Sequence, residues 1–287
     1  GEYRENFILA PLTWFKVGGP ADLLFKPADL EDLSCFLKKL PQDIEIMTLG
    51  AGSNVLIRDG GIDGVVIKLG KAFSSIEIIS DDQIKIGAAC LNYNLAQFCY
   101  QNSIQGFEFL LGIPGSIGGG VAMNAGAYSH EFKDIIISIE AVDRDGVIHT
   151  IPSDQIGFKY RGNSLPKNLI FTGAICHYKI GNQSDIKAQM DQIMTHRTAS
   201  QPVKEKTCGS TFMNLPDQKV WQLIDKAGMR GAIIGGAQMS EMHCNFMINT
   251  GNATASDLEN LGELVRNKVL STSNTQLTWE VKRIGKK

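Results

Sequence analysis

The stretch GIPGSIGGGVAMNAGAY, Gly112 to Tyr128, carries the strongest fold signal in the chain. Six of its seventeen residues are glycine and none is charged. Glycine permits positive φ angles and close approach of the backbone to another group, and free N–H groups in a row suit a bound phosphate. Apolar Ile113, Ile117 and Val121 indicate packing, unlike a flexible linker. We therefore expect a rigid cradle for a phosphorylated cofactor, with tight turns at a sheet edge as the alternative.

A second glycine-rich turn, LGAGSNVLI at 49–57, follows a strand-like run. A dinucleotide-binding fingerprint would continue with a third glycine and a helix. Here a strand-like Val55-Leu56-Ile57 follows instead, and Gly60-Gly61 ends it. The pattern favours a strand–loop–strand turn whose N–H groups face a phosphate, and a glycine-rich hairpin without a ligand is the alternative.

The bulk composition is that of a soluble globular protein. The 287 residues allow two or three domains, and the net charge of -2 gives no reason to expect nucleic acid or an anionic membrane as a partner. No apolar run approaches the roughly 18 residues of a membrane span, and the first residues lack a secretory-signal layout. Six cysteines without a CxxC pair and five scattered histidines indicate no metal site, and we expect reduced thiols in a cytoplasmic protein.

Short strands and glycine turns dominate the chain up to about residue 181, and helices dominate after it, so we expect a cofactor domain followed by a smaller α+β domain. Strands are expected at 21–26, 44–49, 64–69, 76–79, 83–86, 135–142, 147–151, 169–179, 246–249 and 276–284, with a strand-like core at Thr13–Phe15. Helices are expected at 29–40, 91–102, 184–195, 219–227 and 256–270. Asp29 is the expected cap of the first, and Ser256 with Glu259 forms a capping box for the last.

Three polar residues stand in settings that permit chemistry. Arg161 lies in KYRGNS, and a guanidinium suits two-pronged binding of a carboxylate. Ser210 follows Gly209, which allows a sharp turn, and Glu280 lies in a strand-like stretch. Taken singly, a surface arginine, a turn serine and a strand glutamate explain them equally well, and Cys208 is better explained by packing than as a nucleophile.

Six motifs in order resemble the UDP-N-acetylenolpyruvoylglucosamine reductase family, over roughly Asn6 to Gly285. They are LGAGSNVLI at 49–57, GIPGSIGGGVAMNAGAY at 112–128, YRGNS at 160–164, CGSTFMN at 208–214, IGGAQMSEMHCNFMIN at 234–249 and EVKRIG at 280–285. The resemblance implies an α+β fold, with an FAD-binding domain of the vanillyl-alcohol-oxidase/PCMH type and a smaller α+β substrate-binding domain. The expected limits are 1–182 for the FAD-binding domain, split near 72 into two subdomains, 183–273 for the substrate domain, and 274–287 for a C-terminal strand that carries Glu280.

The resemblance further implies tightly bound FAD, NADPH as co-substrate and a UDP-sugar as substrate, in a monomer that binds neither nucleic acid nor membrane. The expected FAD contacts are Gly50, Ala51, Gly52, Ser53, Asn54, Val55, Gly112, Ile113, Pro114, Gly115, Ser116, Gly118, Gly119, Asn124, Ala125, Gly126 and Ala127. The expected substrate contacts are Tyr160, Asn214, Gln238 and Lys204.

The family's catalytic trio maps onto Arg161, Ser210 and Glu280. By that likeness, NADPH reduces FAD, and hydride then passes to C3 of an enolpyruvyl ether. Arg161 opposes the charge that develops toward the carboxylate, Glu280 donates a hydrogen bond to it, and Ser210 delivers a proton to C2. The product is UDP-N-acetylmuramate, a bacterial cell-wall precursor.

The chain departs from the family pattern at Met213, where lysine is usual, and at Leu215, where asparagine is usual before proline. The run from Lys179 to Cys208 is short and carries no tyrosine, which places the chain with the branch that lacks a tyrosine-bearing loop, so Lys204 or Lys206 is the candidate for the diphosphate. Two other functions stay open at this point. One is another FAD-dependent oxidoreductase of the same fold that acts on an alcohol or sugar, and the other is a catalytically silent nucleotide-binding module.

Overall fold

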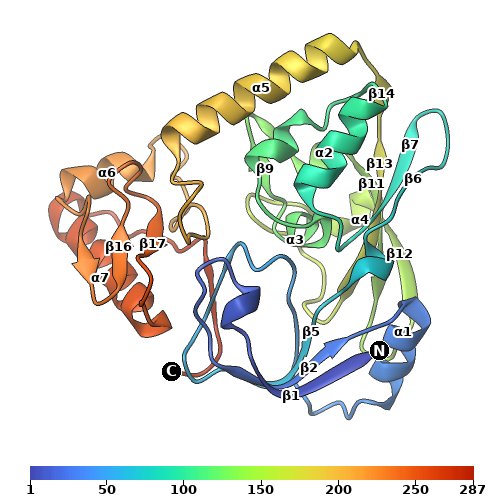
Figure 1. Ribbon diagram of the computed structural model, residues 1–287, viewed down its shortest axis with the longest axis horizontal. Coiled ribbons are helices and arrows are strands. Elements are labelled where there is room, and N and C mark those ends of the chain that lie inside the picture. Colours follow the sequence, from blue (N-terminus) through green and yellow to red (C-terminus); the bar gives the residue numbers. More distant parts are fainter. The chain divides into compact units, whose positions relative to one another are not determined.

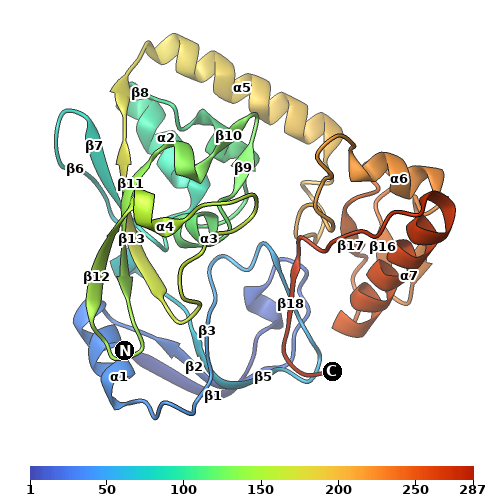
Figure 2. The ribbon, with the colours of Figure 1, turned by 180° about the vertical axis from the view of Figure 1, so that it is seen from behind.

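The computed structural model describes residues 1–287 and contains two compact units. Unit 1 consists of Gly1–Glu5, Leu23–Ala51 and Gly64–Thr195, and unit 2 consists of Asn6–Asp22, Gly52–Asp63 and His196–Lys287. Each unit is therefore assembled from segments that are far apart in the sequence, as the mixed colours of the ribbon show (Figures 1 and 2). The domain limits expected from the sequence stay a prediction.

The larger sheet of unit 1 is antiparallel, with strand order β12-β11-β13-β7-β6. Its strands are β6 (Ile76–Ile78), β7 (Gln83–Gly87), β11 (Ile136–Val142), β12 (Ile148–Pro152) and β13 (Ile170–His177). The turn between β11 and β12 confirms the hairpin expected from its Asp-Gly step. Asp143 Oδ1 accepts the N–H groups of Asp145 and Val147, each at 2.9 Å, and Gly146 has φ +73°.

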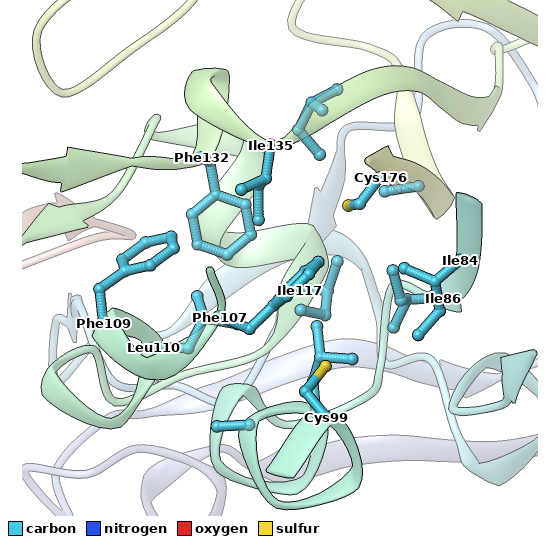
Figure 3. Close-up of a cluster of buried hydrophobic side chains, with 14 of the residues drawn as sticks. Ile84, Ile86, Cys99, Phe107, Phe109, Leu110, Ile117, Phe132, Ile135 and Cys176 are labelled. Atoms are coloured by element: carbon cyan, nitrogen blue, oxygen red, sulfur yellow. The ribbon is translucent and has the colours of Figure 1, made fainter. Parts of the chain in front are cut away.

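Helices cover one side of this sheet and close the main core of unit 1. They are α2 (Asn92–Gln101), α3 (Ile117–Ala122), the short α4 (Ser153–Ile156) and α5 (Gln183–Ser200), of which the part up to Thr195 belongs to this unit. Figure 3 shows the core they form with the sheet, in which Ile84, Ile86, Cys99, Ile117 and Phe132 are buried. α3 was not expected from the sequence. It lies inside the glycine stretch and packs against β13 and β7.

A second sheet, with order β1-β2-β5-β3, carries α1 (Leu30–Lys39) beside it. Its strands are β1 (Glu2–Ile8), β2 (Pro20–Lys26), β3 (Ile46–Thr48) and β5 (Ile62–Ile67). The expected cap of α1 is confirmed, because Asp29 Oδ1 accepts the N–H of Asp32 at 2.9 Å. A separate core of Phe25, Leu33 and neighbouring apolar side chains lies under this helix. Short strand pairs complete the unit, namely β8 (Ile104–Gln105) with β14 (Lys179–Ile180), and β9 (Gly126–Ala127) with β10 (His130–Glu131).

Unit 2 is built around the long helix α7 (Ala255–Ser273). It packs against α6 (Val220–Lys226) and the antiparallel sheet β15 (Ile233–Ile234), β16 (Ala237–Met239) and β17 (Met247–Asn249). A parallel pair joins β4 (Val55–Ile57) to the C-terminal β18 (Lys282–Ile284). The core contains Leu258, Leu261, Val265 and Val269, which recur at helical spacing and so share one face of this helix.

Three secondary-structure expectations are wrong. Thr13–Phe15 forms no strand, because the Thr13 hydroxyl donates to the carbonyls of Ala10 and Val17 and holds the segment as a turn. α7 starts earlier than expected. Thr254 is its N-cap and Asp257 completes the capping box, so Ser256 is already helical. In 276–284 only Lys282–Ile284 is a strand, because only these residues pair with β4.

Candidate functional site

The two glycine stretches meet within unit 1. A Cβ placed on Gly50 would lie 3.0 Å from Ser116 Oγ and 3.9 Å from the Cα of Gly119. Lys68 holds this turn from behind by donating to the Gly50 carbonyl, and burial lowers the pKa of its ammonium group. Two segments that the sequence assigned to one cofactor are thus neighbours at Gly50, and their contacts with a ligand stay a prediction.

The polar groups at this meeting point fit a phosphorylated cofactor. Ser116 Oγ is buried and has no hydrogen-bond partner in the protein, and a buried hydroxyl left unpaired costs about 1–3 kcal/mol. Gly50 and Gly119 leave out the side-chain atoms that would cover it. A ligand oxygen would satisfy the hydroxyl, so the residues present fit the pyrophosphate of FAD.

Other members of the central stretch are required by the fold. A Cβ on Gly118 would lie 2.9 Å from Ala88 Cβ, and one on Gly120 would overlap the Phe132 ring. Ala125 is buried in the core. The Asn124 amide donates to Glu131 Oε2 and to the Lys159 carbonyl, each at 3.1 Å, and accepts the N–H of Lys133 at 3.0 Å. The sequence did not separate these packing roles from ligand contacts.

The first glycine turn continues into unit 2 as Gly52–Val55. Gly52 has φ +71°, and a side chain there would overlap the Leu12 carbonyl, so only glycine fits this turn. Asn54 Nδ2 donates to the Glu280 carbonyl at 3.3 Å, and the Lys282 N–H donates to the Asn54 carbonyl at 3.1 Å. This turn therefore fixes the chain on the C-terminal side of Glu280.

Ser210 and Glu280 are brought together within unit 2. The Glu280 N–H donates to the Thr211 carbonyl at 2.8 Å, and the Met213 N–H donates to the Thr278 carbonyl at 2.9 Å. Both residues are half-buried. Cys208, at the start of the segment, donates through Sγ to the carbonyls of Gly52 and Val55. Burial raises the pKa of this thiol to about 12, so it packs rather than acts as a nucleophile.

Arg161 belongs to unit 1 and stands in a strained conformation, with φ +55°. A left-handed backbone at a residue other than glycine is uncommon and concentrates at functional positions. Its guanidinium donates to the Gly126 carbonyl at 3.2 Å and lies 4.8 Å from the centre of the Tyr160 ring. Arg161 thus extends from its own loop to the end of the central glycine stretch.

The expected substrate residues have separate settings. Tyr160 is 51% exposed, Lys204 is exposed, and Gln238 lies in β16. Asn214 Oδ1 accepts the N–H of Val220 at 3.1 Å, where it serves the start of α6. Their contacts with substrate stay predictions.

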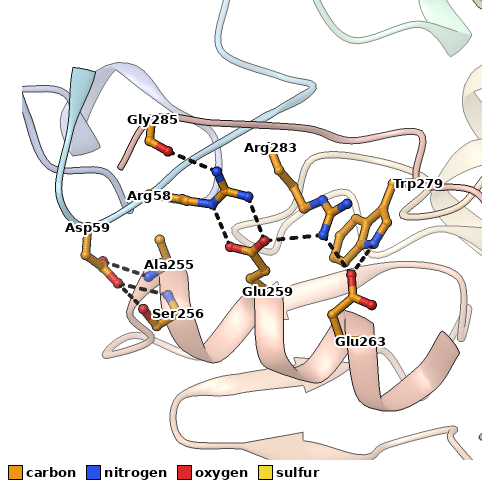
Figure 4. A network of polar contacts seen from close by, with 9 residues as sticks. All are labelled: Arg58, Asp59, Ala255, Ser256, Glu259, Glu263, Trp279, Arg283 and Gly285. Atoms are coloured by element: carbon orange, nitrogen blue, oxygen red, sulfur yellow. Dashed lines mark hydrogen bonds and ion pairs between the residues drawn. The ribbon is translucent and has the colours of Figure 1, made fainter. Parts of the chain in front are cut away.

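Sequence reasoning missed the ion-pair network of unit 2 (Figure 4). Glu259 accepts from Arg58 Nε at 2.8 Å, Arg58 Nη2 at 2.9 Å and Arg283 Nη1 at 3.2 Å, and it takes no part in capping. Glu263 accepts from Arg283 at 2.7 Å and from Trp279 Nε1 at 2.9 Å. The signal available was two glutamates four residues apart on one helix face, whereas their partners are far away in the sequence.

The same network ties the strand pair β4/β18 to α7. Arg58 also donates to the Gly285 carbonyl at 2.9 Å. Asp59 accepts the N–H groups of Ala255 and Ser256, each at 2.9 Å, at the first turn of the helix. Hydrogen bonding to Arg58 lowers the pKa of Glu259, which keeps the pair charged at neutral pH.

All six cysteines are free. No group of three or more histidine, cysteine, aspartate or glutamate side chains is placed to hold a metal ion. None of the helices is both long and apolar enough to cross a bilayer.

The fold and site define a class of protein, an FAD-dependent oxidoreductase with a separate C-terminal domain. The FAD binding domain model matches residues 21–152. The model of the C-terminal domain of UDP-N-acetylenolpyruvoylglucosamine reductase matches residues 201–284. These matches confirm the fold class expected from the sequence.

Relatives identify the particular family. Proteins named UDP-N-acetylenolpyruvoylglucosamine reductase from Rickettsia massiliae (strain Mtu5) and Rickettsia bellii (strain RML369-C) are each 58% identical over 286 residues. The matches cover 100% of this chain and 97% and 95% of those proteins. The crystal structure of UDP-N-acetylenolpyruvylglucosamine reductase (MurB) from Thermus caldophilus superimposes with a TM-score of 0.86 at 31% identity, covering 99% of this chain and 98% of that one. The chain belongs to the UDP-N-acetylenolpyruvoylglucosamine reductase family, as its motifs indicate.

Proposed function

We infer that the chain is an FAD-dependent reductase that uses NADPH to convert the enolpyruvyl ether of UDP-N-acetylglucosamine-enolpyruvate to UDP-N-acetylmuramate in peptidoglycan precursor synthesis. The observation that carries this inference is that the backbone segments of Ser210 and Glu280 adjoin, through the hydrogen bond from the Glu280 N–H to the Thr211 carbonyl, in a chain 58% identical over its full length to reductases of that name. An alcohol- or sugar-oxidising flavoprotein is not favoured, because that chemistry gives no use to this pair.

We assign the cofactor contacts to the glycine turn at 50–55 and to the central glycine stretch. Ser116, with its unpartnered hydroxyl, is the residue best suited to a ligand oxygen, and Gly50 and Gly119 leave room beside it. FAD, when bound, supplies the hydride-transfer chemistry that connects NADPH to the enolpyruvyl substrate. The protein's part is to bind and orient both partners and to manage the proton.

Three side chains take separate roles toward the substrate. Arg161 binds the carboxylate of the enolpyruvyl group, where a planar guanidinium makes two parallel hydrogen bonds. As hydride adds at C3, negative charge moves from C2 into that carboxylate, and Arg161 stabilises it. Glu280, in its protonated form, donates a further hydrogen bond to the carboxylate. Ser210 donates its proton to C2 as the general acid.

Two experiments separate this function from its alternative: NADPH consumption with the enolpyruvyl UDP-sugar, and flavin reduction by an alcohol or sugar followed by exposure to oxygen. Loss of NADPH absorbance under anaerobic conditions is expected to depend on the enolpyruvyl UDP-sugar, one NADPH consumed per substrate reduced. An oxidase of the same fold would instead be reduced by an alcohol or sugar and reoxidised rapidly by oxygen. If the enolpyruvyl UDP-sugar leaves NADPH consumption unchanged, the proposal is wrong.

We further propose that the enzyme works as a monomer in the cytoplasm. Sedimentation equilibrium would give the mass of one chain, and a larger mass at working concentration would contradict the monomer.

A further inference from the structure

In the segment that carries Ser210, the residue on the C-terminal side, Thr211, has both of its main-chain groups hydrogen-bonded. On the N-terminal side of Ser210, Gly209 has φ +77°, and no atom lies within 4 Å of the position that a Cβ would take there. Thr211, by contrast, uses both main-chain groups: its N–H donates to the Asn245 carbonyl at 2.7 Å, and its carbonyl accepts the Glu280 N–H at 2.8 Å. What fixes the two residues after Ser210 therefore contributes to setting its position.

One side chain, that of Asn245, binds both main-chain groups of the next residue, Phe212. Its Oδ1 accepts the N–H of Phe212 at 3.0 Å, and its Nδ2 donates to the carbonyl of the same residue at 2.9 Å. The amide thus acts as a neighbouring strand would, in a position that is only 2% exposed. Buried amide groups paired in this way are costly to disturb, because each lost partner leaves a buried polar group unsatisfied.

The contacts of Asn245 extend to the backbone around two of the three proposed catalytic residues, Ser210 and Glu280. Its main chain binds Thr211, whose carbonyl receives the Glu280 N–H. The next residue, Phe246, forms an antiparallel β-bridge with Ser210 itself.

We propose that Asn245 is a positioning residue for proton transfer, which sets Ser210 beside Glu280 by clamping the Thr211–Phe212 backbone. This inference rests on the proposed function, in which Ser210 is the general acid. It assigns no contact with substrate to Asn245 itself. Its effect must therefore pass through Ser210 and must be confined to the half-reaction that needs a proton.

The test uses Asn245→Asp, which keeps the shape and an acceptor for the Phe212 N–H but removes the donor to the Phe212 carbonyl. Full-length holoenzyme is reduced with one equivalent of NADPH without oxygen, and then mixed with the enolpyruvyl UDP-sugar. Reoxidation of the flavin is expected to slow about a hundredfold, since small misplacements of catalytic groups have effects of that size. Flavin reduction by NADPH and the KM for the UDP-sugar are expected to stay unchanged.

Asn249→Asp is the matched control. Asn249 is also buried, donates to the Phe15 carbonyl at 2.7 Å, and accepts the N–H groups of Gly251 and Ala253 at 2.8 and 3.1 Å. Its replacement is expected to lower the melting temperature as Asn245→Asp does, while both half-reactions keep their rates. Equal slowing of reoxidation in the two variants would overturn the proposal. Should Asn245→Asp not fold, Asn245→Ala removes the clamp without adding charge and gives the same readout.

A double-mutant cycle gives the sharpest outcome. If Asn245 acts through Ser210, then Ser210→Ala combined with Asn245→Asp reoxidises no more slowly than Ser210→Ala alone. Multiplying effects would mean that Asn245 acts independently, and the proposal would be wrong. Failure of the unaltered protein to be reoxidised by the UDP-sugar would contradict the proposed function instead, so the two failures are distinguishable.

Discussion

The central glycine stretch of unit 1 and the Ser210 segment of unit 2 place polar groups by different physical means. In the glycine stretch, the arrangement is created by absent side chains: Gly50 and Gly119 carry no Cβ that would contact Ser116 Oγ. In the Ser210 segment, it is created by hydrogen bonds that join Thr211 to Asn245 and Glu280. The first arrangement depends on the absence of side-chain atoms, and the second depends on a hydrogen-bonded backbone.

The difference predicts different responses to substitution. Adding atoms should damage the first region, and removing hydrogen-bonding groups should damage the second. A region built from missing side chains tolerates loss of a polar group better than gain of a methyl group. A region built from buried hydrogen bonds responds in the opposite way.

The largest effect is expected from Ser210→Ala. Loss of a general acid slows the proton-dependent step by about 10²–10⁴-fold, so reoxidation of reduced flavin by the enolpyruvyl UDP-sugar should fall by that factor. Reduction of FAD by NADPH needs no proton from Ser210 and should keep its rate. Stopped-flow absorbance of the flavin measures both steps. Normal turnover in this variant would show that another group donates the proton.

Next in size is a comparison of two adjacent glycines. In Gly120→Ala the new methyl group would overlap the Phe132 ring at its Cζ atom. Overpacking of this kind is expected to lower the free energy of unfolding by about 3 kcal/mol. Gly119→Ala is the control. It is exposed, and its new methyl group would meet only Ser116 Oγ at 3.6 Å. Urea unfolding of the apoprotein should separate the two, with Gly119→Ala near the unaltered protein. Equal destabilisation would show that both glycines serve packing.

The same two glycines show what the sequence can and cannot tell. Local composition predicted a packed, glycine-rich segment at 112–128 and most of the helices and strands around it. It could do so because periodicity and turn signals act over a few residues. It did not distinguish Gly119 from Gly120, since that difference depends on Phe132, a core residue from another part of the fold. The helix α3 was missed for a related reason: its stability comes from packing on β13 and β7, and glycine has a poor helix propensity.

The proposed catalytic residues were singled out only through the motifs that surround them. Singly, Ser210 and Glu280 had ordinary explanations, and their pairing depends on bonds between segments far apart in the sequence. Asn245 and the Glu259 network were not found at all. A buried asparagine and two glutamates on a helix have no local pattern that indicates their partners, because Phe212, Arg58 and Arg283 approach only in the folded chain.

A smaller effect is expected from Glu259→Gln, which tests the support of the Glu280 segment. Removing hydrogen bonds to a charged group should lower the free energy of unfolding by about 2 kcal/mol at pH 7. Hydrogen bonding to Arg58 lowers the pKa of Glu259 in the folded protein from its ordinary value of 4.5. Its contribution is therefore present above pH 4.5 and lost as the pH falls through the lowered pKa.

Urea unfolding at several pH values checks this sign. The difference between Glu259→Gln and the unaltered protein should shrink as the solution becomes more acidic than pH 4.5. Asp191→Asn is the control, because its pair with Lys187 is exposed on α5 and should contribute about 0.5 kcal/mol or less. A difference that stays constant down to low pH would mean that the side chain acts by packing and not by charge.

The smallest effect on the protein, and the most specific for the cofactor, is expected from Ser116→Ala. The hydroxyl has no partner within the chain, so its removal should leave the unfolding free energy of the apoprotein unchanged or slightly raised. If the hydroxyl binds a phosphate oxygen of FAD, its loss should weaken FAD binding by about 1 kcal/mol, or roughly fivefold in Kd. Titration of apoprotein with FAD, monitored by the quenching of flavin fluorescence, measures that change.

Thr172→Ala is the matched control, because Thr172 Oγ1 is also buried without a partner but lies in β13. It should leave the Kd for FAD unchanged. An identical Kd in both variants would mean that Ser116 only fills space, and the cradle would then rest on the glycine backbone alone.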